Sequence, residues 1–244
     1  MSKKILIIGE SCKDIFVYCS ANRLAPDIPV PVLNILHQTE NPGMAKNVQR
    51  NVNKIFEHCD ILTNNNWENI TKTRYMHLDS NHMFIRVDSD HSKISKINLN
   101  NIDFNYDLIA ISDYNKGFLQ EADIEYICNN HKNVFLDTKK KINNWASKAK
   151  IIKINNYEYN QSKNSMSREI LDKTIRTNGP EGCYFQGKQY PVNKIEVKDS
   201  SGAGDTFFAG LIATYIKTND IEESIKFANI CASKVVQEKG VTTI

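Results

Sequence analysis

A run of small residues ending in an acid, Asp-Ser-Ser-Gly-Ala-Gly-Asp-Thr at residues 199–206, is the part of this chain best suited to chemistry. Residues 191–198 before it are β-like and an apolar, helix-like segment follows, so we expect a strand to give way to a helix here. A helix start leaves backbone N–H groups unpaired and partially positive, and Gly202 and Gly204 would let that backbone approach an anion closely. Asp205 would then lie beside an anion hole. This pairing suits phosphoryl transfer, in which the amides stabilise the transferring group and the carboxylate accepts a proton from the attacking hydroxyl.

The same run has a simpler interpretation. It could be an ordinary tight turn in which Asp205 or Ser201 caps the following helix. The local residues are compatible with both interpretations, so the surrounding elements must decide between them.

Composition restricts the class of protein. With 244 residues, 41% of them hydrophobic and 24% charged, the chain can bury a sizeable core. The net charge of +3 is too small to indicate a nucleic-acid-binding protein. Six scattered cysteines without a Cys-x-x-Cys pair favour reduced thiols over disulfides or zinc ligands. The chain opens with no secretory signal and has no apolar run of about 18 residues, so we expect a cytoplasmic protein without a transmembrane helix.

Continuous apolar runs recur along the chain and are typical of strands buried on both faces of a parallel sheet. They lie at residues 3–9, 108–112, 133–137 and 151–154. Each run ends in a polar or small residue, and helix-like segments such as 119–129 lie between them. This alternation predicts an α/β fold with a doubly wound, mostly parallel sheet that binds ligands at the carboxyl ends of its strands.

Two segments differ from this pattern. Residues 15–37 are rich in Val, Pro and aromatic residues, and residues 71–88 alternate like a pair of strands, 72–78 and 83–87, that turn at 79–81. We expect them to form a small β lid set apart from the main sheet. The organisation predicted is one domain over residues 1–244, with a hairpin at 182–191 and an amphipathic helix at 221–237 near its end.

Several motifs, taken in order, resemble the ribokinase-like (PfkB) carbohydrate kinase family. Residues 199–207 resemble its Asp-Thr-x-Gly-Ala-Gly-Asp signature, with Ser200 in place of Thr, and residues 41–48 resemble its Gly-Gly-containing sugar motif. Residues 23–32, Arg-Leu-Ala-Pro-Asp-Ile-Pro-Val-Pro-Val, resemble the heptose 7-phosphate kinase branch of that family. Further similarities to this branch lie at residues 72–75, 84–88, 112–117 and 136–139, so the resemblance touches most of the chain.

The resemblance implies a ribokinase-like fold and an ATP-dependent sugar kinase that uses Mg²⁺. The heptose branch implies phosphorylation of D-glycero-D-manno-heptose 7-phosphate at its anomeric hydroxyl, which gives heptose 1,7-bisphosphate for lipopolysaccharide biosynthesis. It also implies a homodimer formed through the lid.

Matching motif by motif, the resemblance assigns Asp205 as the catalytic base and Gly202, Ala203 and Gly204 as the anion hole. Asn155 would bind the nucleotide, and Glu158 would hold magnesium through water. From the residues alone, this pair could equally be a helix start with a capping interaction. The remaining nucleotide-binding residues implied are Thr177, Gly179, Gly182 and Asn229, with Gly240 near the end of the pocket. The alternative for Asn229 is an exposed helix residue.

On the substrate side, the resemblance assigns Asp14 to the sugar hydroxyls, with Gly43 and Asn47 beside it. The alternative for Asp14 is a solvated turn acid. The candidates for holding a phosphate already present on the substrate are Arg23, Arg74, Arg86 and Lys116, any of which could instead have a surface or structural role.

The chain also departs from the family pattern. Met44 replaces the second glycine of the sugar motif, and Asn81-His82 stands where the heptose branch tends to carry glutamines. The stretches 59–72 and 159–175 are shorter than usual. These departures leave two alternatives open, a kinase of another sugar or sugar phosphate and a non-catalytic nucleotide- or sugar-binding pseudokinase.

Overall fold

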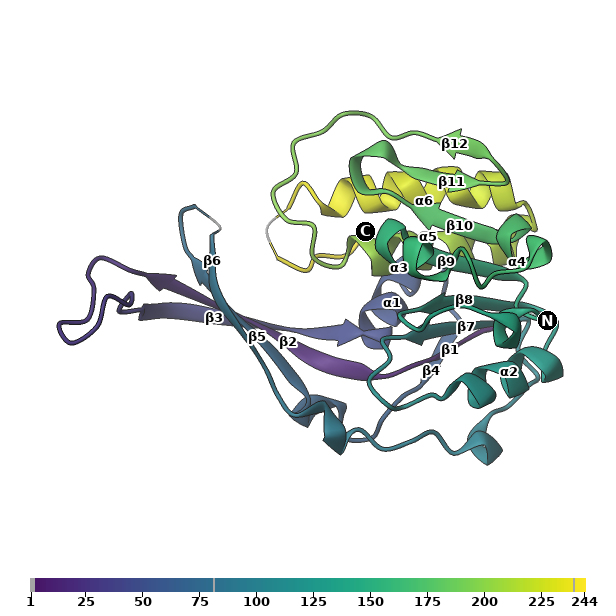
Figure 1. Cartoon of the computed structure of the whole chain (residues 1–244), viewed down its shortest axis with the longest axis horizontal. Coiled ribbons are helices and arrows are strands. Elements are labelled where there is room, and N and C mark those ends of the chain that lie inside the picture. The colour runs from purple at the N-terminus through teal and green to yellow at the C-terminus, as the bar shows by residue number, and fades with distance from the viewer. Residues whose placement is uncertain (1–2, 81, 239) are drawn as a thin grey trace.

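The computed structural model describes residues 3–80, 82–238 and 240–244. Its main body is an eight-stranded sheet of order β12-β11-β10-β9-β8-β7-β1-β4 (Figure 1). The strands are β1 (Ile5–Ile8), β4 (Cys59–Leu62), β7 (Leu108–Asp113), β8 (Val134–Thr138), β9 (Ile151–Asn155), β10 (Thr174–Thr177), β11 (Cys183–Phe185) and β12 (Lys188–Tyr190). Neighbours from β4 to β10 are parallel, and the β11–β12 hairpin adds antiparallel strands at one edge. The predicted doubly wound, mostly parallel α/β sheet is confirmed.

Helices cover both faces of this sheet because each central strand is apolar on both sides. In β1, Ile5 and Ile7 belong to one buried cluster, whereas Leu6 and Ile8 belong to the other. The first cluster includes residues of α1 (Ala45–Val52), α5 (Ala203–Thr218) and α6 (Ile221–Val235). The second includes residues of α2 (Glu121–Asn130), α3 (Asn156–Ser162) and α4 (Arg168–Asp172). Short 3₁₀ turns lie at η1 (Trp67–Asn69), η2 (His91–Lys93), η3 (Leu99–Asn101), η4 (Asn144–Ala146) and η5 (Gly179–Glu181).

A second, four-stranded sheet projects from the main body as an arm (Figure 1). Its order is β3-β2-β5-β6, formed by β2 (Ser11–Ser20), β3 (Asn34–Met44), β5 (Thr71–His77) and β6 (Met83–Asp88). These strands contain much of the predicted segments 15–37 and 71–88, and β5 and β6 lie within one residue of the strands predicted there. The turn predicted at 79–81 and the pair at 81–82 both include Asn81, which lies outside the described residues.

The predicted β-like run at 191–198 is wrong. β12 is the last strand of the sheet before α5, and residues 191–198 form an irregular connection between them. The backbone N–H groups of Lys198 and Asp199 donate to the carbonyl of Val236 just beyond α6, so the segment leaves the sheet instead of pairing with it. A loop therefore precedes α5 in place of the expected strand.

Two composition-based expectations can be compared with the structure. All six cysteines are buried and carry free thiols. Within the described residues, no helix combines the length and apolar character needed to cross a bilayer.

Candidate active site

Asp205 lies in the first turn of α5, and its side chain is only 7% exposed. Its Oδ2 accepts a hydrogen bond from Asn47 Nδ2 at 2.9 Å, and its Oδ1 accepts one from the Tyr114 hydroxyl. Gly202 holds the N-cap position in a left-handed conformation with φ of 80°, and no side-chain capping bond is found at this helix start in the described chain. The simpler interpretation of the motif, in which Asp205 or Ser201 caps α5, is therefore wrong.

Opposing effects act on the pKa of the Asp205 carboxyl group, and their net result raises it above its usual value. Burial raises the pKa of its carboxyl group, and the nearby Asp137 carboxylate raises this pKa further. The hydrogen bonds from Asn47 and Tyr114 lower the pKa because they stabilise the ionised form, and the Lys153 ammonium also lowers it. A buried carboxylate held in this way can act as a general base.

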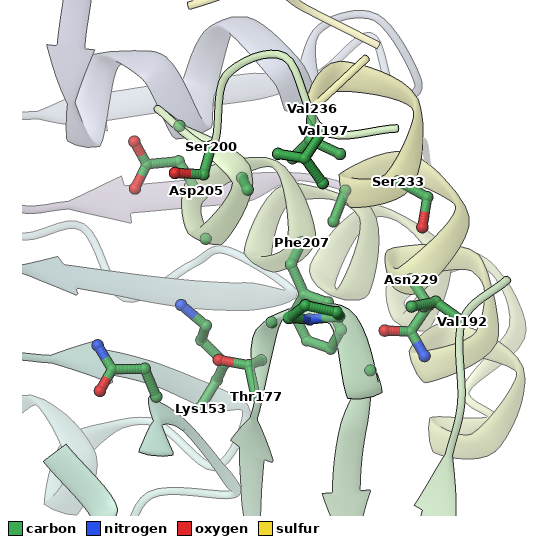
Figure 2. A pocket seen from close by; sticks show the side chains of 18 of the residues that line it. Lys153, Thr177, Val192, Val197, Ser200, Asp205, Phe207, Asn229, Ser233 and Val236 are labelled. Atoms are coloured by element: carbon green, nitrogen blue, oxygen red, sulfur yellow. The ribbon is translucent and has the colours of Figure 1, made fainter. Parts of the chain in front are cut away.

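Asp205 lies where two cavities meet. The larger has a volume of about 1100 Å³, and Figure 2 shows it with Asp205 at one end and Asn229 at the other. The smaller has a volume of about 420 Å³. Both are lined by Tyr114, Lys139, Gly202 and Asp205. The carboxylate therefore faces any pair of ligands that occupy the two cavities together.

The larger cavity contains the residues predicted for the nucleotide. Its lining includes Asn155, Thr177, Gly179, Gly182 and Asn229, together with Gly202, Ala203 and Gly204. Asn229 is buried and donates through Nδ2 to the carbonyl of Tyr190 at 2.9 Å, so the alternative of an exposed helix residue is wrong. Gly240 is not among the lining residues; its N–H donates to Asp199.

Asn155 and Glu158 form a reciprocal capping box at the start of α3, as the alternative interpretation proposed. Glu158 N–H donates to Asn155 Oδ1 at 2.9 Å, and Asn155 N–H donates to Glu158 Oε2 at 2.7 Å. Glu158 Oε1 also pairs with Lys139 Nζ at 2.5 Å. Asn155 lines the larger cavity in addition to its capping role, whereas Glu158 lines neither cavity.

The residues around the larger cavity fit a magnesium ion held mostly by phosphate and water. No group of three or more His, Cys, Asp or Glu side chains in the described parts of the chain could hold a metal ion. Asp137 nevertheless presents one buried carboxylate oxygen without a hydrogen-bond partner, while its other oxygen pairs with Lys153 Nζ at 2.7 Å. Carboxylate oxygen is a ligand that magnesium prefers, and this ion usually keeps several waters.

The smaller cavity contains most of the predicted substrate residues: Asp14, Asn47, Arg74, Arg86 and Lys116. Asp14 is buried and its Oδ1 pairs with Arg74 at 2.6 Å, so the alternative of a solvated turn acid is wrong. Gly43 lies behind this pair, where a Cβ would come within 2.2 Å of Asp14 Oδ2. Arg23 lies in the exposed connection between β2 and β3, outside the cavity lining.

Sequence reasoning missed several residues of the site. Lys72 is 6% exposed and lines the smaller cavity, with its ammonium 4.9 Å from the centre of the Tyr114 ring. Lys153 is 2% exposed and lines the larger cavity. A signal for Lys153 was present, because a lysine interrupts the apolar run of β9 and burial of an unpaired charge is unfavourable.

Met44 occupies an unusual backbone conformation beside the smaller cavity. It has φ of 59° and ψ of −131°, it is buried, and it lines the cavity immediately before α1. A non-glycine residue in this region of backbone space carries strain of about 1–3 kcal/mol. The strain and the side chain are both located at the wall of the cavity that contains most of the predicted substrate residues.

Comparisons with known proteins agree with this fold and site. The family model described as pfkB family carbohydrate kinase matches residues 105–244. The bifunctional protein HldE of Helicobacter pylori strain J99 is 29% identical over 295 residues, covering 98% of this chain and 64% of that protein. HldE of Campylobacter curvus is 26% identical over 303 residues, covering 100% of this chain and 64% of its own length. The chain thus spans less than two thirds of these relatives.

Solved structures show the same fold at low sequence identity. Ribokinase from Thermotoga maritima superposes with a TM-score of 0.75 at 15% identity, covering 98% of this chain and 94% of that one. Phosphofructokinase-2 from Escherichia coli, in complex with potassium, has a TM-score of 0.71 at 12% identity, with coverages of 99% and 94%. These similarities establish a ribokinase-like fold.

Proposed function

We propose that this chain, which belongs to the pfkB family of carbohydrate kinases, transfers the γ-phosphoryl group of ATP to D-glycero-D-manno-heptose 7-phosphate at its anomeric hydroxyl. The product would be heptose 1,7-bisphosphate. The observation that carries the proposal is the position of Asp205 between a cavity of nucleotide size and a smaller, basic cavity. The motifs that resemble the heptose 7-phosphate kinase branch support the choice of sugar.

In this reaction Asp205 accepts the proton of the acceptor hydroxyl as that oxygen attacks the γ-phosphorus in line. The backbone N–H groups at 202–204, at the start of α5, stabilise the charge on the transferring group. The N–H of Ala203 donates to the Ser200 carbonyl at 3.3 Å in this structure and would exchange this partner for the phosphoryl group. Lys153 lies beside this turn, because a Cβ on Gly204 would come within 3.2 Å of its Nζ. Magnesium, when bound, would neutralise phosphate charge, with Asp137 at the wall of the larger cavity holding it. Glu158, which lines neither cavity, would reach the ion only through water.

The charge of the smaller cavity supports an acceptor that already carries a phosphate. Its lining includes the cations Lys72, Arg74, Arg86, Lys116 and Lys139. Arg74, Arg86 and Lys139 have carboxylate partners, whereas no ion pair is found for Lys72 or Lys116 among the described residues. A neutral sugar would leave these two ammonium groups uncompensated, and a phosphate group would pair with them.

Met44 favours a second candidate, a kinase of a different sugar phosphate. Its side chain lines the acceptor cavity at a position where the family carries glycine, so the shape of the preferred acceptor would differ. The chemistry assigned to Asp205 is the same in both cases.

We further propose that the four-stranded sheet closes over the acceptor cavity as a lid and pairs with a second copy of the chain. Exclusion of water by the lid would limit ATP hydrolysis.

Met83, Ile85 and Val87 alternate along β6 and are about half exposed, at 46%, 53% and 50%. An apolar row of this kind favours association. Sedimentation should give a dimer that Ile85→Asp converts to a monomer, whereas a wild-type monomer would contradict the pairing.

The reaction can be tested by ³¹P NMR of mixtures containing the purified protein, Mg-ATP and one of four acceptors. Heptose 7-phosphate, fructose 6-phosphate, fructose and ribose would be compared. A new glycosyl phosphate signal with heptose 7-phosphate alone is expected. Turnover of another acceptor would retain the kinase and reject the heptose assignment. ATP binding without turnover of any acceptor would favour the pseudokinase.

A further inference from the structure

Tyr114 is not among the residues assigned above to the reaction, and it lies against the proposed base. We infer that Tyr114 is a positioning residue, whose hydroxyl holds the Asp205 carboxylate at the junction of the two cavities. This inference rests on the proposed function, because it matters only if Asp205 is the base.

The contacts of Asp205 fix the orientation of its carboxylate from two sides. Asn47 of α1 donates to Oδ2, and Tyr114, in the loop after β7, donates to Oδ1. Each oxygen retains a lone pair for an acceptor hydroxyl. With both oxygens bound to donors on different elements, the carboxylate plane has little freedom to rotate away from the junction of the two cavities.

Two ammonium groups lie near the Tyr114 ring. Lys72 Nζ lies 4.9 Å from the ring centre and Lys139 Nζ lies 5.6 Å from it. An ammonium group over an aromatic face is attracted by the ring quadrupole. Lys72 lines the acceptor cavity and Lys139 lines both cavities, so the ring forms part of the wall that both ligands would contact.

The backbone on each side of Tyr114 is anchored by buried charges. Asp113 accepts hydrogen bonds from the Thr138 hydroxyl at 2.5 Å and from Lys140 Nζ at 3.0 Å. On the other side, the N–H of Lys116 donates to Glu10 Oε1 at 2.7 Å. Because Asp113 and Glu10 are almost completely buried, these bonds restrict the loop and keep the Tyr114 hydroxyl at Asp205.

The hydrogen bond from Tyr114 also affects the charge of the base. Burial raises the pKa of Asp205 most strongly, and the bonds from Asn47 and Tyr114 oppose that effect. Several titratable and charged groups surround Asp205. They are Asp137 on β8, Lys139 just after it, Lys153 on β9, Cys12 and Asp14 on β2, Lys72 and Arg74 on β5, Arg86 on β6 and Lys116 in the loop after β7. Burial raises the pKa of Cys12 to about 12, so this group is a neutral thiol. Burial and the charge of Asp205 raise the pKa of Tyr114 well above its usual value, so its hydroxyl remains a donor at neutral pH.

The test is the pH dependence of kcat/KM for Tyr114→Phe, which keeps the ring and removes only the donor. We expect the acidic limb to move upward by about one pH unit, because a hydrogen bond to a charged group is lost. The KM for ATP should change less than about twofold. The matched control is Tyr106→Phe, which removes a 2.8 Å hydroxyl bond to the Asp60 carboxylate remote from both cavities and should leave the profile unchanged. A uniform loss of activity at every pH, or an unchanged profile, would overturn the inference.

A second readout does not depend on turnover. In protein labelled with ¹³C at the aspartate carboxyl carbons, the Asp205 signal can be assigned by its absence in Asp205→Asn. Its titration midpoint should lie higher in Tyr114→Phe than in wild type, and an equal midpoint would overturn the inference. If the Asp205 midpoint is lower in wild type than in Tyr114→Phe but the wild type phosphorylates no sugar, the proposed function fails. The positioning of Asp205 by Tyr114 then still stands.

Discussion

Gly43 sets how closely β3 approaches Asp14, and we predict that Gly43→Ala selectively impairs binding of the acceptor. A Cβ at residue 43 would lie 2.2 Å from Asp14 Oδ2 and 2.9 Å from Cys12 Sγ. Both distances are far shorter than ordinary van der Waals contacts. Asp14 must therefore move away, which disrupts its 2.6 Å ion pair with Arg74 and displaces the carboxylate expected to bind sugar hydroxyls.

The size of the effect follows from the interaction lost. A hydrogen bond to a charged group contributes about 1.5–3 kcal/mol, so loss of the Asp14 contact should lower kcat/KM for the acceptor by about 10- to 100-fold. Gly43 does not line the larger cavity, so the KM for ATP should stay within about twofold of wild type.

The assay is steady-state ADP release with acceptor and ATP varied separately, accompanied by thermal unfolding. Gly187→Ala is the matched control, because Gly187 has φ of 76° but open space around a new Cβ, in the hairpin between β11 and β12. It should lose stability through backbone strain and keep its acceptor kinetics. An unaltered acceptor kcat/KM in Gly43→Ala, or an equal loss in the ATP parameters, would refute the reasoning.

Two further predictions concern charge. Lys72→Met should raise the KM of a phosphorylated acceptor about tenfold, since the lost ammonium is buried and has no ion pair among the described residues. The KM of a neutral sugar should stay nearly unchanged. Lys13→Met, at a more exposed lysine paired with Glu40, is the kinetic control, and equal effects on both acceptors would contradict the phosphate role. Burial, and to a smaller extent the nearby Asp113 charge, raises the pKa of Glu10 from 4.5 to about 6. Between these two pH values the native state binds more protons than the unfolded state, so the free energy of unfolding falls as the pH rises. Glu10→Gln should therefore increase the free energy of unfolding by up to about 2 kcal/mol at pH 7 and have little effect near pH 4; urea unfolding at both pH values measures this, and a difference independent of pH would exclude the mechanism.

The elements that could be predicted from sequence are those whose signal is local. The strands β1, β7, β8 and β9 are buried on both faces and therefore appear as continuous apolar runs. The run at 191–198 looks like a strand because apolar residues alternate with polar ones, but several of its apolar residues, such as Val192 and Val197, line the larger cavity. Composition alone does not distinguish a side chain facing a cavity from one facing a sheet neighbour.

The candidate site was predictable where one short motif carries it, and less so where distant segments meet. Asp205 and its glycines follow one another in the chain, so their chemistry could be inferred together. Tyr114 is 91 residues from Asp205 in sequence, and nothing near it indicates that its hydroxyl reaches the carboxylate. Asn155 and Glu158 show the opposite case, because their capping box is local and was foreseen as an alternative.

The central claim is that Asp205 is the base of a sugar kinase, and Asp205→Asn tests it most directly. The measurement is ADP formation from Mg-ATP and heptose 7-phosphate by wild type and variant, with ATP binding followed in parallel by calorimetry. The account predicts turnover by wild type, a loss of about 10²- to 10⁴-fold in the variant, and ATP binding retained by both. Equal turnover by the two proteins would contradict the role of Asp205, and a wild type that binds ATP without phosphorylating the sugar would contradict the proposed reaction.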